Sequence, residues 1–181
     1  TGKTVFASSF AMFAAGRAFE QIRNSIGYPH LNVKICATHA GISVGEDGAT
    51  HQCNEDIALM RTIPGMVVIN PSDAVEARAA VEAAINYQGP VYIRFGRLAL
   101  PIINEQEGYS FQIGKAIKVA DGKDVTIVAN GMMVAEAIEA RKMLAGEGIS
   151  ASIINMHTVK PLDVESLVAD AKITGAVVVS E

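Results

Sequence analysis

Residues 66–95, MVVINPSDAVEARAAVEAAINYQGPVYIRF, decide the fold, because an apolar run, a helical pattern and a second apolar run follow one another directly. MVVIN and VYIRF are almost wholly apolar, which is typical of parallel strands that helices cover on both faces. Asp73 and Glu76 have the spacing of a capping box at the start of the helix, and Gly89-Pro90 ends it. The stretch therefore predicts two parallel strands joined by a crossover helix.

The same alternation continues on both sides of this stretch. We expect strands over residues 4–8, 33–38, 124–129, 150–156 and 176–180, and helices over 11–26, 54–63, 133–148 and 165–173. The pattern lapses over residues 98–112, LALPIINEQEGYSFQ, which contain a proline, acids and no periodicity. The expected fold class is thus α/β, with a parallel-sheet domain over residues 1–99, a linker over 100–113 and a smaller α/β domain over 114–181.

Both ends of the sequence interrupt this alternation. The chain has no initial methionine and enters a strand almost at once, and it stops on VVVSE at the end of another expected strand. A strand of a parallel sheet is normally followed by a loop and a helix. We therefore expect a fragment of a longer protein, in which both domains are truncated.

The composition excludes several classes of partner. A net charge of −4 and the lack of any Lys/Arg run argue against nucleic-acid binding. The apolar runs are too short to span a membrane, and no signal-peptide pattern opens the chain. The two cysteines, Cys36 and Cys53, suit a reducing compartment rather than a disulfide framework, so we expect a cytoplasmic protein.

Titratable groups and glycines are concentrated in residues 38–52, THAGISVGEDGATHQ, between an expected strand and helix. A zinc site is disfavoured, because Cys36 and His39 are an odd number of residues apart and would point to opposite faces of a strand. A dinucleotide-binding turn is disfavoured too, because the glycines are spaced G-x₃-G-x₂-G rather than G-x-G-x-x-G. We therefore expect no metal bound by this chain.

Two interpretations of the loop stay open on these grounds. The loop follows the carboxyl end of a strand, where open α/β sheets bind ligands. His39, Glu46, Asp47 and His51 could bind a polyhydroxylated or anionic ligand, and the histidines could move protons near neutral pH. The same groups could equally satisfy one another in a capped surface loop.

The aromatic and cationic residues outside the loop each allow two interpretations. Phe10 and Phe13 share one helix face, which suits either core packing or stacking on a flat heterocycle. Arg94 and Arg97 follow the last strand of the first domain, so one of them could bind a phosphate or carboxylate, or form a surface ion pair. In the second domain, His157 suits a structural role, so this domain is expected to be a scaffold or assembly surface.

Taken together and in order, these segments resemble transketolase. THAGISVGEDGATHQ is similar to that family's TH-x-x-I-x-x-GEDG-x-THQ signature, and SSFAMF and GPVYIRFGR resemble its thiamine-pyrimidine (Pyr) domain. GKDVTIVANGMMVAEA and INMHTVKPLD resemble its C-terminal domain. The resemblance spans nearly the whole chain and implies the C-terminal section of a transketolase, with the loop as a ligand-binding element.

The resemblance also implies roles for individual residues. Phe10 and Phe13 match aromatics around the aminopyrimidine of thiamine diphosphate. His39 matches a histidine near the substrate phosphate, and His51 a histidine on the thiazolium side of the cleft that assists proton movement; both are expected to be catalytic. Asp47 matches the acid that binds a substrate hydroxyl.

Arg97 matches the phosphate-binding arginine of the family, which implies that Arg94 faces away from the cleft. The sequence also departs from the family pattern. Gly16 replaces a third aromatic, which implies a more open pyrimidine pocket, and Ala49 replaces a common proline, which should loosen the loop. The glutamate that protonates the pyrimidine belongs upstream of Phe10. The diphosphate-binding section, which holds Mg²⁺ or Ca²⁺, is not in this sequence.

The implied reaction is thiamine-diphosphate-dependent transfer of a two-carbon ketol unit between sugar phosphates, as in the pentose phosphate pathway. The implied partner is a diphosphate-binding section or a second protomer, in a homo- or hetero-oligomer. Deoxyxylulose-phosphate synthase shares the domain plan but typically has Asp-Arg where Thr38-His39 stands here. The β subunit of a 2-oxoacid dehydrogenase lacks the GEDG-x-THQ pattern. A different alternative is a non-catalytic assembly subunit.

Overall fold

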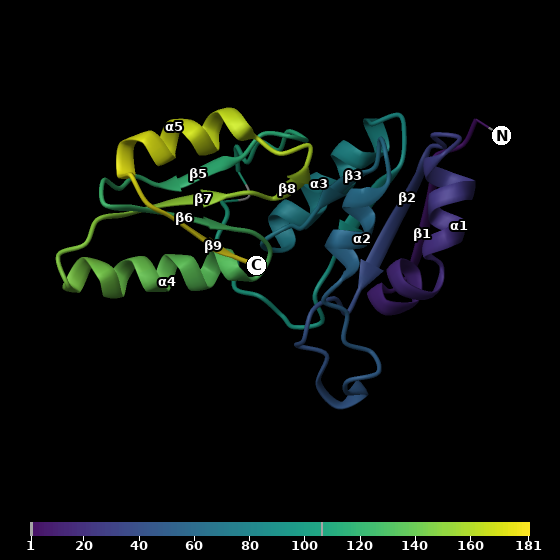
Figure 1. The fold of residues 1–181 in the computed structure, drawn as a ribbon, viewed down its shortest axis with the longest axis horizontal. Helices are drawn as coiled ribbons and strands as arrows, with labels where there is room; N and C mark the ends of the chain where they lie inside the picture. The colour runs from purple at the N-terminus through teal and green to yellow at the C-terminus, as the bar shows by residue number, and fades with distance from the viewer. Residues whose placement is uncertain (1, 106) are drawn as a thin grey trace. The chain divides into compact units, whose positions relative to one another are not determined.

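The computed structural model describes residues 2–105 and 107–181, and in it the chain divides into two compact units (Figure 1). Unit 1 runs to Asn70 and resumes over Arg78–Ala99, whereas unit 2 comprises Pro71–Ala77 and Leu100–Glu181. Each unit is built of strands and helices that alternate along the chain, which confirms the predicted α/β class.

Unit 1 contains a parallel sheet in which the strands lie in the order β1-β2-β4-β3. Its strands are β1 (Val5–Phe10), β2 (Val33–Thr38), β3 (Val67–Ile69) and β4 (Val91–Arg94). Its helical segments are η1 (Met12–Arg17), α1 (Phe19–Gln21), η2 (Ile22–Gly27), η3 (Gly45–Asp47) and α2 (Asp56–Thr62), and α3 (Ala74–Asn86) begins in unit 2 and ends in unit 1. Because all four strands run in parallel, their carboxyl ends lie along one edge of the sheet.

The single helix expected over residues 11–26 is divided in the structure. η1 and η2 are π-helical and are joined by the short α1. The Ala18 N–H donates to the Phe13 carbonyl five residues back (3.1 Å), which widens the turn. The periodicity of the sequence placed this helix correctly but did not predict its internal geometry.

The apolar runs of the first domain predicted strands covered on both faces, which is confirmed for β3 and β4 and wrong for the edge strand β1. β2, β3 and β4 are largely buried, but β1 is mostly exposed, with Val5 at 43% and Phe6 at 41%. In unit 2, β9 (Val177–Ser180) is likewise exposed, with Val179 at 70%. The physical reason is position, because β1 and β9 each stand at the end of their sheet's strand order.

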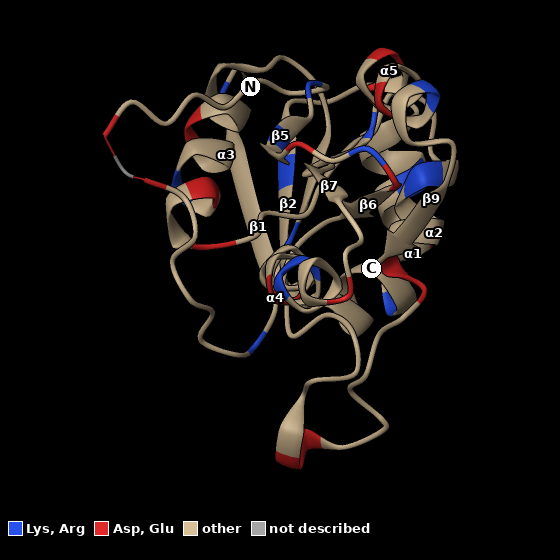
Figure 2. Ribbon diagram, turned by 90° about the vertical axis from the view of Figure 1, so that its left-hand side faces the viewer, with Lys and Arg blue, Asp and Glu red and all other residues tan. Residues whose placement is uncertain are grey.

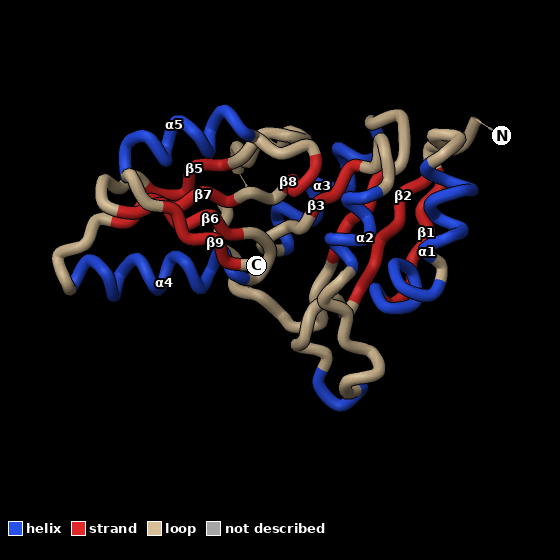
Figure 3. Tube along the Cα trace, viewed as in Figure 1, coloured by secondary structure: helices blue, strands red, loops and turns tan. Residues whose placement is uncertain are grey.

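Unit 2 contains a mixed sheet in the order β5-β7-β6-β9, in which β5 runs antiparallel to β7 (Figure 3). Its remaining elements are β5 (Ile117–Ala120), β6 (Val125–Ala129), α4 (Met133–Gly146), β7 (Ala151–Asn155), β8 (Thr158–Lys160) and α5 (Val164–Thr174). Alternate residues of β6 and β7 pack against α4 on one face and α5 on the other. The sequence predicted all of these except β5 and β8, which are too short and too polar to give an apolar run.

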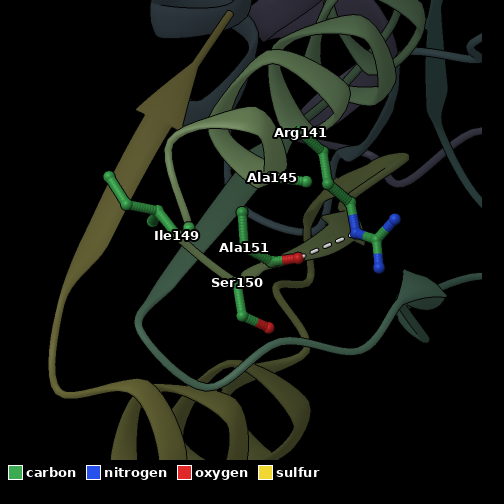
Figure 4. Close-up of a pocket in the computed structure, with 6 residues that line it drawn as sticks. Arg141, Ala145, Ile149, Ser150 and Ala151 are labelled. Carbon is green, nitrogen blue, oxygen red and sulfur yellow. Dashed lines mark hydrogen bonds between the residues drawn. The ribbon is translucent and has the colours of Figure 1, made fainter.

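Two side chains fix the ends of elements in unit 2. Asp163 caps α5 by accepting a hydrogen bond from the Ser166 N–H (3.1 Å). Arg141 of α4 donates from Nε to the Ala151 carbonyl (2.9 Å) at the start of β7, beside a small pocket of about 210 Å³ (Figure 4). No helix among the described residues is long and apolar enough to cross a bilayer.

Candidate functional site

The carboxyl ends of β1 and β2 bring the first predicted site residues together. The two strands are parallel neighbours. Phe10, expected on the first helix with Phe13, is instead the last residue of β1 and pairs in register with Thr38, because the strand extends two residues beyond the apolar run that predicted it. His39 follows directly, and its imidazole stacks on the Phe10 ring with centroids 4.0 Å apart and planes 16° from parallel. The pair therefore forms a flat, half-buried surface at the edge of the sheet where ligands bind in this fold class.

Phe13 and His51 lie beside Phe10 and His39, and the four rings together form an aromatic wall. The rings of Phe10 and Phe13 are parallel to within 2° at 5.9 Å. The His51 imidazole meets both edge-on, at 5.8 Å from Phe10 and 5.2 Å from Phe13. The structure thus brings four rings into one cluster, those of Phe10, Phe13, His39 and His51. The first and last of them are 41 positions apart in the sequence.

Arg17 belongs to the same wall and was not predicted from the sequence. Its guanidinium carbon lies 4.6 Å from the centroid of the Phe13 ring, which is the geometry of a cation–π contact. The spacing of four residues on a helix is the signal that could have suggested it. At Gly16 the terminal methyl of Met12 overlaps the position of an added Cβ, so Met12 fills the space beside the missing aromatic.

Backbone geometry fixes the direction of His39. Its φ is +59°, a left-handed conformation that a residue with a side chain rarely adopts. Such strain is found where the surrounding structure holds a functional group in place. The Thr38 hydroxyl lies 3.1 Å from His39 Nδ1, and the Thr50 hydroxyl lies 2.9 Å from His51 Nδ1. Each threonine therefore orients the imidazole that follows it.

The loop between β2 and α2 is closed at its neck and projects from the sheet, with acidic residues at its tip (Figure 2). Gly41 and Cys53 exchange two backbone hydrogen bonds of 2.8 and 3.1 Å, and the Gln52 side chain donates to the Ile42 carbonyl. These contacts belong to the capped-loop interpretation, whereas the ring contacts of the two histidines belong to the ligand-binding one. The loop combines a self-satisfied neck with functional groups that face other elements.

The tip of the loop contacts Arg97. Arg97 Nη2 donates to Glu46 Oε1 at 2.8 Å, and Arg97 Nε lies 3.9 Å from Asp47 Oδ2. The Glu46 carboxyl has a pKa below its usual range, first because its own backbone N–H bonds it and then because Arg97 is positively charged. The φ of Gly45 is +71°, a conformation that favours glycine, and a Cβ added there would lie 3.0 Å from Arg97 Nη1, so the guanidinium packs closely against this turn.

Arg94 has a different partner from Arg97. β4 ends at Arg94, so the alternation of a strand does not extend to Arg97, which lies on the loop beyond. Arg94 Nε donates to Asp56 Oδ2 at 2.9 Å, and the Tyr92 hydroxyl donates to the same oxygen at 2.8 Å. Asp56 is fully buried at the start of α2, and burial strongly raises the pKa of the Tyr92 hydroxyl. Reasoning from sequence missed this network.

The cysteines and acids of the described residues do not form a cluster of metal ligands: no group of three or more His, Cys, Asp or Glu side chains there could hold an ion. Cys53 is buried, and burial together with the charges of Asp56 and Glu55 raises the pKa of its thiol to about 11. The Cys36 thiol also has a raised pKa because of burial. Both thiols are therefore protonated near neutral pH and are suited to packing.

Two family models match the chain. The transketolase pyrimidine-binding domain matches residues 1–102, and the transketolase C-terminal domain matches residues 114–181. A protein of Methanocaldococcus jannaschii named as a transketolase C-terminal section is 55% identical over 166 residues, which are 91% of this chain and 52% of that protein. A 6-deoxy-6-sulfo-D-fructose transketolase subunit of Clostridium sp. (strain MSTE9) is 45% identical, over 99% of this chain and 56% of that protein.

A solved structure of a split-gene transketolase, in an inactive β4 tetramer, has a similar fold. It superposes with a TM-score of 0.93 at 54% identity and covers 99% of this chain and 58% of that one. The chain thus spans about half the length of the curated relatives it matches. On these matches the chain belongs to the transketolase family, as a subunit or section that carries the pyrimidine-binding fold and the C-terminal domain fold.

Proposed function

We propose that this chain is the pyrimidine-binding part of an enzyme that transfers a two-carbon ketol unit between sugar phosphates with thiamine diphosphate. The observation that carries the proposal is the ring cluster at the carboxyl ends of β1 and β2, in which His39 stacks on Phe10 at 4.0 Å. The pyrimidine-binding domain is proposed to cover residues 1–99, and the C-terminal domain residues 114–181. The reaction would serve the pentose phosphate pathway, in the cytoplasm.

The aromatic wall suits the cofactor of this family. Phe10 and Phe13 present parallel rings with apolar faces, and a planar aminopyrimidine binds favourably beside such rings. When bound, thiamine diphosphate supplies the carbon nucleophile and the electron sink that ketol transfer requires. The diphosphate group and its Mg²⁺ or Ca²⁺ are proposed to bind a separate diphosphate-binding section.

The polar residues divide the remaining tasks among them. Arg97 would bind the terminal phosphate through its guanidinium, with His39 as a second donor. Asp47, half-buried beside Arg97, would accept a hydrogen bond from a substrate hydroxyl and so select its configuration. His51, held by Thr50 and with its ring edge against both phenylalanines, would move a proton near the reacting carbon.

Reconstitution tests this proposal. The chain is mixed with a diphosphate-binding transketolase section, thiamine diphosphate and Mg²⁺, and ketol transfer from a ketose phosphate to an aldose phosphate is followed. We expect turnover in the complete mixture and none from the chain alone, because the cofactor's diphosphate needs the other section. Replacing Phe13 with Ala should raise the Kd of the cofactor about tenfold, since one ring contact is lost.

The matched control for Phe13→Ala is Tyr28→Ala, because Tyr28 is an aromatic residue that is 90% exposed and lies outside the ring cluster. A complete mixture that binds the partner but transfers nothing would overturn the proposal. It would favour the alternative of an assembly subunit, which the inactive β4 tetramer of the split-gene relative brings into consideration.

A further inference from the structure

The proposed reaction gives no role to the contact between Glu46 and Arg97. The loop tip carries two acidic side chains, and both approach the same guanidinium, at 2.8 Å for Glu46 and 3.9 Å for Asp47. A proposed phosphate-binding arginine is therefore already paired with carboxylates of its own chain.

The edge of the guanidinium that they occupy is the important detail. Glu46 accepts from Nη2 and Asp47 lies nearest to Nε; these two nitrogens form the side-on edge of an arginine, and Nη2 also shares the end-on edge with Nη1. The side-on edge offers two parallel N–H groups, which is the geometry that a bidentate carboxylate or phosphate takes. The opposite nitrogen, Nη1, faces Gly45. A bidentate anion uses Nη2 whether it binds Arg97 side-on with Nε or end-on with Nη1, so it competes with Glu46 for that nitrogen.

The Glu46 side chain can leave Arg97 at small energetic cost. It is 82% exposed, whereas Arg97 and Asp47 are 32% and 34% exposed. Exposed ion pairs contribute little to stability, so an incoming anion can release Glu46 into water at small cost. Asp47, which is less exposed, can stay beside the site and bind the substrate hydroxyl that the proposed function assigns to it.

We infer that Glu46 is an internal competitor for the terminal anion of the substrate at Arg97, and that it lowers affinity for dianionic groups more than for monoanionic ones. The inference rests on the proposed role of Arg97. A phosphate monoester is close to a dianion at pH 7, whereas a sulfonate carries a single charge. The repulsion from Glu46 and Asp47 scales with that charge, so Glu46 is a specificity-determining residue for the terminal group.

The test compares wild type with Glu46→Gln, which keeps the shape of the side chain and removes its charge. In the reconstituted complex, KM is measured for fructose 6-phosphate and for 6-deoxy-6-sulfofructose. We expect KM for the phosphate to fall about two- to fivefold and KM for the sulfonate to fall less. Glu139→Gln is the matched control, because Glu139 is also an exposed glutamate paired with a cation, Lys142, at 2.6 Å.

A second arm uses the full chain without its partner and does not depend on catalysis. Inorganic phosphate is titrated while the backbone N–H signal of Gly45, which lies beside the Arg97 guanidinium, is followed by NMR, and Glu46→Gln should again bind about two- to fivefold more tightly. The gain should vanish when Arg97 is replaced by Met, because the competition needs the guanidinium. If the complex transfers no ketol unit, the proposed function fails while this arm still decides the role of Glu46.

Other outcomes overturn the inference. A weaker phosphate affinity in Glu46→Gln would mean that Glu46 orients Arg97 for the substrate rather than competing with it. Equal gains for phosphate and sulfonate would remove the charge selectivity. An unchanged affinity in both arms would leave the Glu46–Arg97 pair as a surface contact without a role in binding.

Discussion

Arg94 and Arg97 stand three residues apart and yet engage their acids in different surroundings. Arg94 reaches a fully buried carboxylate, Asp56, that also accepts the Tyr92 hydroxyl. Arg97 reaches the exposed Glu46. Because an ion pair shielded from water cannot lose one member without leaving a buried charge, the first pair is structural, and the second can exchange with a ligand.

Replacing Asp56 with Ala should therefore destabilise the chain by about 3 kcal/mol, because the Arg94 charge and the Tyr92 hydroxyl both lose their acceptor. Urea unfolding followed by circular dichroism measures this loss. Glu139→Ala removes an exposed ion pair and should cost less than about 1 kcal/mol. A loss at Asp56 no larger than the loss at Glu139 would show that the buried network contributes little.

At the scale of elements, the cap residue of α3, Asp73, also makes hydrogen bonds to a segment that is distant in the sequence. The Asp73 half of the predicted capping box is confirmed, because the Glu76 N–H donates to Asp73 Oδ1 at 2.9 Å; the Glu76 side chain accepts from the Ser72 N–H at 2.6 Å instead of from the Asp73 N–H. The other Asp73 oxygen accepts from the backbone N–H groups of Ile103 and Asn104, each at 2.8 Å. One carboxylate thus begins a helix and also holds an irregular segment about thirty residues further along the chain.

The Asp73 cap should make stability depend on pH. Burial alone would raise its pKa, but hydrogen bonds from Glu76, Asn104 and Ile103 outweigh it and hold the pKa of the Asp73 carboxyl below its usual value of 3.8. A depressed pKa means that the ionised form stabilises the fold above about pH 4, and that this stability is lost as the pH falls further.

Asp73→Asn should accordingly cost about 2 kcal/mol at pH 7, where wild type has the charged cap, and progressively less below pH 4. Urea midpoints measured from pH 7 to pH 3 test this. Asp121→Asn serves as the control, since the Asp121 side chain is 98% exposed. A difference between wild type and Asp73→Asn that stays constant over this range would refute the linkage.

At the scale of the whole molecule, the chain covers 52% and 56% of the two curated relatives described above. Its aromatic wall is proposed to contact only the pyrimidine part of the cofactor, so cofactor binding should depend on the section that holds the rest. Cofactor binding should thus depend on assembly of the chain with that section rather than on any single residue of the chain.

A thermal-shift experiment tests that dependence. Thiamine diphosphate with Mg²⁺ should leave the Tm of the isolated chain unchanged, because a ligand stabilises only a state that it binds. The same additions in the presence of the diphosphate-binding section should raise Tm, by an amount that grows with cofactor concentration. A comparable rise for the chain alone would show that the pyrimidine wall binds the cofactor without its partner.

Much of the fold could be predicted because its signals are local. Apolar runs, caps and turns lie within a few residues of one another, and they placed the strands β2, β3, β4, β6 and β7 and the helices α2 to α5. The antiparallel β5 and the short β8 were missed because they have no long apolar run. The exposure of β1 and β9 was also missed, because a strand's position in its sheet depends on its neighbours in space.

The sequence alone determined the α/β class, the loop of residues 38–52 and, through resemblance, the transketolase family, because each rests on residues near one another in the chain. Composition and spacing left open whether that loop binds a ligand or only caps itself; the resemblance implied ligand binding but gave Glu46 no role. Only the tertiary structure brought Phe10 to His39 and Arg97 to Glu46, which is 51 residues away in the sequence. Such contacts form where parallel strands end at a common edge, and no local pattern of residues specifies them.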